Sequence, residues 1–333
     1  MQNELAAGSH QQLHDESIVF DASMVAELSD DHIDRMRRGG VTAINHTVCT
    51  PYATTREALS QIGAARRWID AHPDELVLAL TVDDVRRAKA ESRQAVLFGP
   101  QDTEMIGADI GLLNTFYDLG TRFLQLTYQR QNLIGAGCGE NEDSGLTHFG
   151  REFVREMNAL GIVVDVSHCG ERTGLDAMSS SSTPVVVTHS FAHELSPHIR
   201  AKTDDFVRAL AAQGGVMGIT TLSGFLYYPD DKTRRPDLKR FAEHVAHVAE
   251  VGGVESVAVA TDYEETLYRE EYESSAVAAM VGVRSFDDRR AIGMEDGSRF
   301  PNITQALLQQ GFSPEEIKLI LGENWMRVLK EVC

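Results

Sequence analysis

Two stretches near the middle of the chain indicate its fold: Ile-Val-Val-Asp-Val-Ser-His at 162–168 and Pro-Val-Val-Val-Thr-His-Ser at 184–190. Each is an almost continuous β-branched run that ends in polar residues. Strands that are apolar on both faces and alternate with helical segments are typical of a parallel sheet covered by helices. The two stretches therefore predict parallel strands whose polar carboxyl ends lie at one edge of the sheet.

The same pattern recurs along the whole chain. Six further apolar runs lie at 18–20, 41–44, 95–98, 123–126, 216–219 and 257–260. Segments with helical periodicity separate the runs, among them 54–71, 150–160 and 238–251. Eight alternating units predict an α/β fold, a (β/α)8 TIM barrel. A doubly wound open sheet is the alternative, but no Gly-x-Gly-x-x-Gly motif follows the first run.

We expect a single domain over residues 1–333, because no linker rich in Pro, Gly or Ser divides the chain. It would consist of the barrel, a short N-terminal extension and a C-terminal helical pair within about 301–333. The helices of that pair are expected at Thr304 to Gln310 and Pro314 to Val332. One apolar segment, 75–80, exceeds the count of eight, and we expect it as an appended strand or part of an inserted layer.

Composition and charge exclude several classes of partner. The chain has 31 Lys and Arg against 50 Asp and Glu, a formal charge of −19 with His neutral. This excess disfavours nucleic acid and anionic membrane surfaces. No apolar run approaches the roughly 20 residues of a membrane span, and no signal peptide is evident at the start. The four Cys residues lack the spacing of a disulfide framework, which favours a reducing, cytoplasmic location.

Candidate chemistry lies at the strand ends, where barrel enzymes place their active sites. His168 follows the fifth run, His189 the sixth and Asp262 the eighth. Two neutral imidazoles and a carboxylate at one barrel mouth suit a divalent metal such as zinc, which can generate hydroxide near neutral pH. His46 also ends a run, but we expect it to be a core or loop residue. The remaining histidines are expected mostly at the surface, including His10, His14, His32, His72, His244 and His247.

Longer motifs extend over most of the chain. They include Phe116 to Gly120, Leu126 to Tyr128, Gly145 to Thr147, Val164 to His168, Thr188 to Ser190, Ala260 to Tyr263 and Leu321 to Trp325. Together they closely resemble the renal (membrane) dipeptidase family of zinc peptidases. The resemblance runs from about Ile18 to the C terminus, and it implies a barrel of the amidohydrolase type and a homodimer.

The resemblance implies roles for four residues that this chain keeps. His168 and His189 match the two His ligands of one zinc in the family. Arg200 matches the Arg that holds the substrate carboxylate. Asp262 matches the Asp that lies beside the metals near the eighth strand.

Four other positions of the family's site have changed. The His-x-Asp pair that holds the other zinc corresponds to Ser23 and Val25, and the carboxylate that bridges both zincs corresponds to Gln101. A His that helps to bind the reacting carbonyl corresponds to Tyr128, whose phenol can stabilise an oxyanion or simply line the pocket. Val25 cannot ligate a metal and Gln101 brings no charge, so a binuclear centre is not expected.

The first functional hypothesis is a divergent dipeptidase-like hydrolase with at most one divalent metal, acting on a small carboxylate-bearing amide. In it His168 and His189 hold the metal, and Asp262 orients or deprotonates the attacking water. Arg200 and Gln101 contact the substrate, and Tyr128 binds substrate and stabilises developing charge.

Two other hypotheses remain open from the sequence. One is a metal-free barrel that binds a small carboxylate as a sensor or pseudoenzyme. The other is metal-independent catalysis with His168 or His189 as general base beside Asp262. Nearby acids could replace the missing ligands in principle, and these are Asp21, Asp102 and Glu104, although Asp21 reads more simply as a structural hydrogen-bond acceptor.

Overall fold

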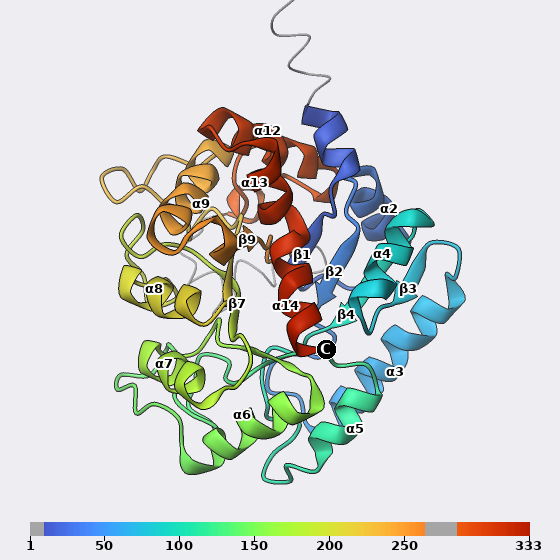
Figure 1. Ribbon diagram of the computed structural model, residues 1–333, viewed down its shortest axis with the longest axis vertical. Coiled ribbons are helices and arrows are strands. Elements are labelled where there is room, and N and C mark those ends of the chain that lie inside the picture. Colours follow the sequence, from blue (N-terminus) through green and yellow to red (C-terminus); the bar gives the residue numbers. More distant parts are fainter. Residues whose placement is uncertain (1–9, 264–284) are drawn as a thin grey trace, which may run out of the picture.

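Parallel strands and helices alternate along the chain in the computed structural model, which describes residues 10–263 and 285–333 (Figure 1). The strands are β1 (Phe20–Met24), β2 (Ala43–His46), β3 (Leu76–Leu78), β4 (Gln94–Phe98), β5 (Phe123–Gln125), β6 (Val163–Asp165), β7 (Val186–Ser190), β8 (Val216–Ile219) and β9 (Val257–Val259). The α-helices are α2 (Asp30–Arg38), α3 (Thr55–Ala71), α4 (Val82–Ala90), α5 (Leu112–Asp118), α6 (His148–Leu160), α7 (Glu171–Ser180), α8 (Asp204–Ala212), α9 (Leu238–Gly252), α12 (Phe300–Gln310), α13 (Pro314–Lys318) and α14 (Asn324–Val332). Residues 10–16 are also helical.

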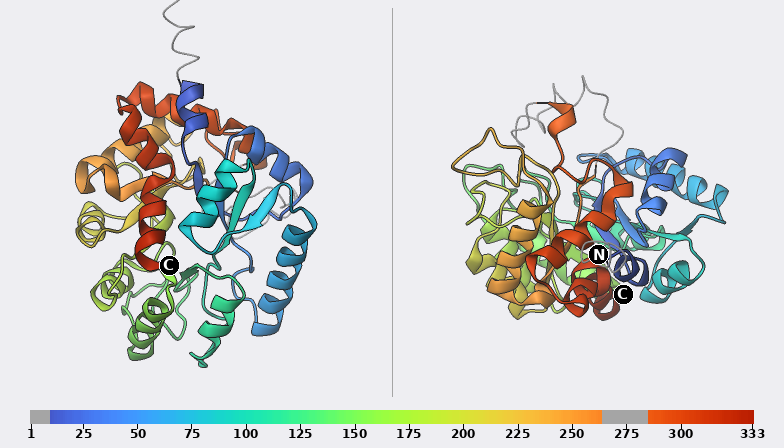
Figure 2. Two further views of the ribbon diagram at one scale, coloured as in Figure 1. Left: turned by 45° about the vertical axis from the view of Figure 1, so that its right-hand side comes forward. Right: turned by 90° about the horizontal axis from the view of Figure 1, so that it is seen from above.

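The strands form two parallel sheets, in the orders β1-β2-β4-β3 and β5-β6-β7-β8-β9. Backbone contacts join the sheets at both seams. Met24 at the end of β1 pairs with Tyr263 just after β9, and Phe98 at the end of β4 pairs with Thr121 just before β5. The eight predicted strands therefore follow one another around a ring, and the (β/α)8 fold class is confirmed; Figure 2 shows the outer helices from two further sides.

The apolar segment at 75–80 contains the ninth strand, β3, which pairs with the first residues of β4. It is thus an appended strand, as predicted. One edge of β4 pairs with β2. The other edge pairs with β3 at its first residues and with Thr121, just before β5, at its last residue.

The C-terminal helices close one end of the barrel. In Figure 1, α14 lies across the middle of the molecule. Its fully buried Trp325 packs against Phe20 and Phe123, with ring centroids 6.3 and 6.4 Å away, and donates a hydrogen bond to the Val259 carbonyl at 3.2 Å. These contacts fill the barrel interior from its amino-terminal end and leave the carboxyl ends of the strands for a site. The predicted helical pair is present, with the π-helical turn η4 (Leu319–Glu323) between α13 and α14.

The prediction of surface positions was wrong for three histidines, because His14, His32 and His244 are fully buried or nearly so. His14 bridges Thr304 and the Gly39 carbonyl at 2.7 and 2.8 Å. His244 accepts a hydrogen bond from a backbone amide, and His32 packs on an aromatic ring. Their partners lie far away in sequence, so the local polar setting of each residue gave no sign of its burial.

Candidate functional site

His168 and His189 meet at the carboxyl ends of two neighbouring strands. His168 follows β6 by three residues and His189 lies within β7, and their Nε2 atoms are 2.9 Å apart. Both rings are buried. Burial, reinforced by the positive charge of Arg200, lowers the pKa of each imidazole well below its ordinary value. Both rings are therefore neutral at neutral pH and can offer a lone pair to a metal or to a proton.

Arg200 lies against the two histidines. Its guanidinium donates to the carbonyls of Ser167 and His189, and only 1% of the residue is exposed. Its Nε has no hydrogen-bond partner among the described residues. A guanidinium carries five N–H groups, so these contacts leave donors for a substrate carboxylate, and that role stays a prediction.

Tyr128 forms an aromatic wall beside the metal-binding candidates. Its ring stacks on His168 with centroids 4.1 Å apart and planes 24° from parallel. Tyr52 packs edge-on against Tyr128 and donates its hydroxyl proton to the Tyr128 carbonyl at 2.5 Å. The structure thus brings Tyr128 to the site, as expected, and adds Tyr52, which the sequence did not single out.

Asp262 belongs to a hydrogen-bonded chain of polar residues on the other side of the mouth. The Gln101 amide donates to Thr47 at 2.9 Å and to Ser23 at 3.3 Å, and the Ser23 hydroxyl donates to Asp262 at 3.3 Å. Burial raises the pKa of the Asp262 carboxyl, while Arg200 and Ser23 oppose the shift. Asp262 also has a left-handed φ of 55°, a conformation that Asp adopts more readily than most residues.

The mouth fits one divalent ion better than two. Two nitrogens bound to one tetrahedral zinc lie roughly 3.3 Å apart at ordinary Zn–N bond lengths, close to the 2.9 Å between the two Nε2 atoms. The other position offers the neutral groups of Ser23 and Gln101, already hydrogen-bonded to each other, and the aliphatic Val25. These residues do not fit a second cation.

Asp262 does not complete a three-ligand set with the two histidines. The candidate ligand atoms are those of His, Cys, Asp and Glu within residues 10–263 and 285–333. Of these residues, only Glu194, Asp204 and His247 bring three such atoms within 4.8 Å of one another. That group lies on the outer helices and the loop before them, and it is already joined by a 2.7 Å bond between His247 and Asp204. An ion in the barrel mouth would therefore have two protein ligands, and its other positions would be open.

Sequence reasoning missed the polar residues behind the histidines. Asp165 is buried, and it accepts hydrogen bonds from both Ser167 and Thr188. The available signal was a carboxylate inside the apolar run 162–166, three residues before His168. Asp21 directly follows the first run and accepts from Thr261, as expected of a structural hydrogen-bond acceptor.

The model of the family described as "Membrane dipeptidase (Peptidase family M19)" matches residues 7–276 and 278–333. The chain belongs to the membrane dipeptidase family. A curated relative, dipeptidase tcpJ of Claviceps purpurea, is 29% identical over 283 residues, which are 84% of this chain. The chain spans 61% of the length of that relative.

Two solved structures share the fold over almost the whole chain. An amidohydrolase from Pseudomonas aeruginosa is 30% identical, with a TM-score of 0.88 over 97% of this chain and 98% of that one. A metallo peptidase from Rhodobacter sphaeroides, solved with a phosphinate mimic of the dipeptide L-Ala-D-Ala, is 21% identical, with a TM-score of 0.81 over 96% of this chain and all of that one. The amidohydrolase-type barrel that the motifs implied is therefore confirmed.

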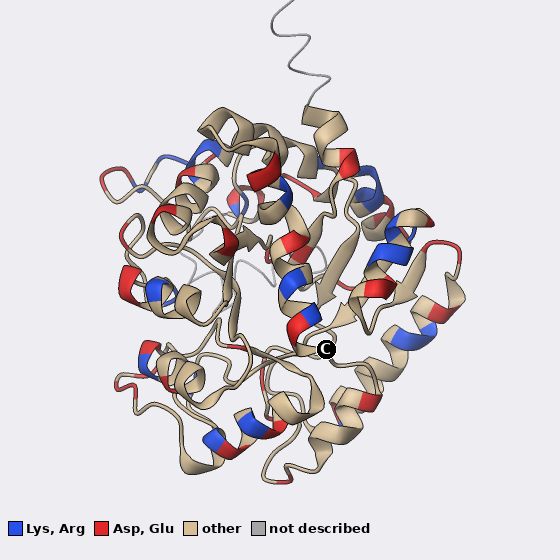
Figure 3. Ribbon diagram, in the orientation of Figure 1, with Lys and Arg blue, Asp and Glu red and all other residues tan. Residues whose placement is uncertain are grey.

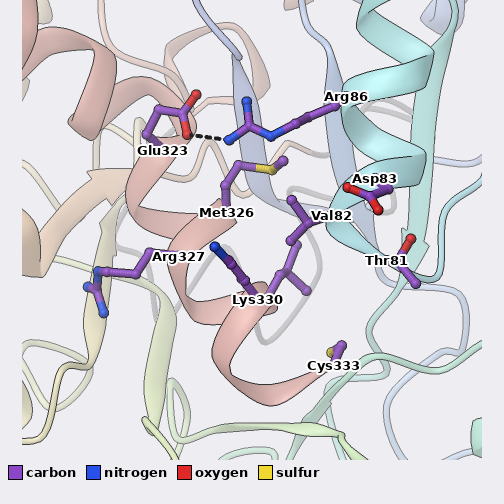
Figure 4. Close-up of a pocket in the computed structure, with 10 residues that line it drawn as sticks. Thr81, Val82, Asp83, Arg86, Glu323, Met326, Arg327, Lys330 and Cys333 are labelled. Atoms are coloured by element: carbon purple, nitrogen blue, oxygen red, sulfur yellow. Dashed lines mark hydrogen bonds and ion pairs between the residues drawn. The ribbon is translucent and has the colours of Figure 1, made fainter.

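Despite the family's name, none of the helices in the described ranges combines the length and the apolar character that a membrane crossing needs. A pocket of about 530 Å³ lies away from the histidines, between α4 and α14 at the closed end of the barrel. Figure 4 shows its lining, in which Arg86 and Glu323 form an ion pair of 3.1 Å. None of the predicted site residues lines this pocket.

Proposed function

We propose that this membrane dipeptidase family member hydrolyses a small, dipeptide-like amide that carries a carboxylate, with at most one divalent ion. The observation that supports this most directly is the meeting of the His168 and His189 Nε2 atoms, 2.9 Å apart, with Arg200 hydrogen-bonded beside them. The other half of the mouth is occupied by neutral groups that hydrogen-bond to each other.

Each residue has a distinct part in this proposal. His168 and His189 hold the ion, which when bound supplies a water of lowered pKa. Asp262 accepts a proton from the attacking water; its raised pKa brings it closer to the working range of a general base. Arg200 binds the substrate carboxylate, and Tyr128 donates a hydrogen bond to the charge that develops on the reacting carbonyl.

The proposal is tested by metal analysis combined with hydrolysis assays on dipeptides and N-acyl amino acids. We expect no more than one ion per chain, and loss of hydrolysis on chelation that recovers when metal is returned. His168→Ala and His189→Ala should lose the ion. His247→Ala, in the outer group of three ligands, is the matched control and should keep it. Two tightly held ions per chain would overturn the single-metal proposal.

A second candidate is a metal-free barrel that binds a small carboxylate without hydrolysing it. The direct hydrogen bond between the two imidazoles favours it, because that bond satisfies both Nε2 atoms without an ion. Its expected outcome is carboxylate binding by calorimetry, no bound metal and no turnover. Hydrolysis that survives complete removal of metal would instead favour His168 or His189 as general base.

The wider setting of the protein is also a proposal. We infer a homodimer in a reducing, cytoplasmic compartment, with a small carboxylate as the partner molecule and with neither nucleic acid nor membrane bound. The negative charge of −19 and the four unpaired cysteines support this setting. Light scattering after size exclusion tests the dimer, and a monomer at micromolar concentration would contradict it.

A further inference from the structure

We propose that Asp165 is a positioning residue that holds His189 as the Nδ1–H tautomer, acting through the hydroxyl of Thr188. The inference depends on the proposed function in one respect only, the role of His189 Nε2 in holding the ion. The geometry that carries it lies behind the barrel mouth, in side chains that touch neither the proposed ion nor the substrate.

Asp165 receives its hydrogen bonds from two residues, and each of these directly precedes one of the histidines. Oδ1 accepts from the Ser167 amide at 3.0 Å, the Ser167 hydroxyl at 2.5 Å and the Thr188 amide at 3.0 Å. Oδ2 accepts from the Thr188 hydroxyl at 2.6 Å. The buried carboxylate therefore fixes the ends of β6 and β7 together, at the positions that carry His168 and His189.

The Thr188 hydroxyl links this carboxylate to the imidazole. Its oxygen lies 2.6 Å from Asp165 Oδ2 and 2.9 Å from His189 Nδ1. A hydroxyl has one proton to donate. Asp165 accepts four hydrogen bonds, which stabilise its ionised form against the rise in pKa that burial causes. An ionised carboxylate can only accept, so the Thr188 proton points at Asp165. The Thr188 oxygen is then an acceptor toward His189, which must carry its proton on Nδ1.

This tautomer leaves the His189 Nε2 lone pair facing His168. A metal or a transferred proton needs that lone pair, and a metal-binding imidazole is commonly fixed by an acceptor at its other nitrogen. His168 has no such partner, because its Nδ1 is buried without a hydrogen bond. The hydrogen-bonded chain from Asp165 thus fixes the tautomer of His189, and without an ion the bond between the two Nε2 atoms places the His168 proton on Nε2. Because His168 Nδ1 has no partner holding it, that proton can leave Nε2 when an ion binds.

Asp165→Asn gives the sharpest test, because the amide should reverse the direction of both hydrogen bonds, from His189 Nδ1 to Thr188 and from Thr188 to residue 165. The three groups around Oδ1 include two backbone N–H groups that can only donate, so the amide oxygen should occupy that position. The amide nitrogen then takes the position of Oδ2 and donates to Thr188. The Thr188 proton then has two acceptors within reach, His189 Nδ1 at 2.9 Å and the Ser167 hydroxyl oxygen at 3.0 Å. Donation to Nδ1, the stronger acceptor of the two, should move the imidazole proton to Nε2.

The readout is the tautomer itself, observed by 1H–15N NMR on protein labelled at histidine, with the His189 signals assigned by their loss in His189→Gln. We expect a proton on Nδ1 in the wild-type protein, with or without metal, and in Thr188→Ser, which keeps the hydroxyl. We expect that proton to move to Nε2 in Asp165→Asn, and the Nδ1–H signal to be lost in Thr188→Val.

Asp21→Asn is the matched control. It makes the same exchange between Asp21 and Thr261, whose hydroxyl bonds to Asp21 and not to a histidine, so the His189 signals should not change. An Nε2–H tautomer in the wild-type protein, or an unchanged Nδ1–H signal in both Asp165→Asn and Thr188→Val, would overturn the proposal. The tautomer is read without substrate, so failure of the proposed hydrolysis would not change this result.

Discussion

At the scale of single residues, two buried carboxylates perform similar structural tasks on different sides of the barrel. Asp21 joins the start of β1 to Thr261 after β9, and Asp165 joins the end of β6 to Thr188 in β7. Each Asp accepts from both the amide and the hydroxyl of a threonine that directly precedes a predicted site residue. The site residues are therefore positioned by carboxylates that do not themselves face the mouth.

The first prediction at this scale concerns Asp21, whose pKa burial raises to about 6 from an ordinary value near 3.8. The folded state holds the proton more tightly than the unfolded state. The stabilisation from the protonated carboxyl is therefore complete below about pH 4 and is lost as the pH rises through 6, a change of about 3 kcal/mol. Asp21→Asn should remove this part of the pH dependence, measured by urea unfolding between pH 4 and 7.

Asp102 also has a pKa raised by burial to about 6, so Asp21→Asn should reduce the slope of unfolding free energy against pH without abolishing it. The double variant with Asp102→Asn should be flatter still. Parallel curves for the wild-type protein and Asp21→Asn would contradict the assignment.

A second residue-scale prediction concerns Gln101, which the resemblance to the family matches to its bridging carboxylate. Gln101→Glu removes the amide donor to Ser23 and Thr47 and adds an anion to a network that already contains Asp262. We expect a loss of about 1–3 kcal/mol at pH 7, measured by urea unfolding, and partial recovery on adding zinc. The uncharged Gln101→Met should lose less and should not respond to zinc, and a Gln101→Glu variant as stable as wild type in chelator would refute this reading.

How far the residues of the site could be predicted depended on where their partners lie. His168, His189 and Asp262 were evident because each follows an apolar run, and strand ends converge in a barrel. The contacts of Arg200 with the carbonyls of Ser167 and His189 were not evident, since they depend on how the loop after β7 folds back over the strands. Nothing in the local sequence around Ser23 shows that it bonds to a residue 239 positions away.

At the scale of elements, apolar runs predicted where strands lie better than where they end. The run at 184–187 predicted a strand that in fact spans Val186–Ser190, because hydrogen bonds to β8 continue through the polar residues. Helix starts follow their capping residues closely: Thr54 with Glu57 begins α3, and Ser313 with Glu316 begins α13. Strand ends are set by pairing with a neighbouring strand, which no single run contains.

The prediction that belongs to this scale concerns α14, which closes the barrel with Trp325. Trp325→Ala should cost about 3–5 kcal/mol, because it empties a fully buried site between Phe20 and Phe123. Trp325→Phe keeps an aromatic ring but leaves the Val259 carbonyl without its donor, and should cost about 1–2 kcal/mol. Denaturant unfolding measures both.

The other tryptophan supplies the control for this prediction. Trp68 on α3 is only partly buried and stacks on His72 at 3.9 Å. Trp68→Phe should therefore change the free energy of unfolding by less than about 1 kcal/mol. Equal losses at the two positions would mean that α14 does not close a packed interior.

At the scale of the whole molecule, the acidic excess lies outside the barrel. Figure 3 shows acidic and basic residues spread over the outer helices and loops. Many acids pair locally, as Asp34 does with Arg37 at 2.8 Å and Asp205 with Arg208 at 2.7 Å. At the mouth, by contrast, Arg200 is a buried cation beside the two histidines, and Gln101 and Ser23 are neutral. The proposed carboxylate site thus lies within a molecule of net negative charge.

This arrangement predicts that self-repulsion lowers the stability of the protein at low ionic strength. The net charge is −19, and the screening length falls from about 30 Å at 0.01 M salt to about 8 Å at 0.15 M. We expect the thermal midpoint to rise over this range, by roughly 2–4 °C for each kcal/mol of repulsion relieved.

The paired variant Asp74→Asn and Glu142→Gln removes two exposed charges, which changes the net charge from −19 to −17, and should reduce the rise in the thermal midpoint. Scanning calorimetry at several sodium chloride concentrations measures it, and a midpoint that falls with salt would show that local ion pairs outweigh the net repulsion.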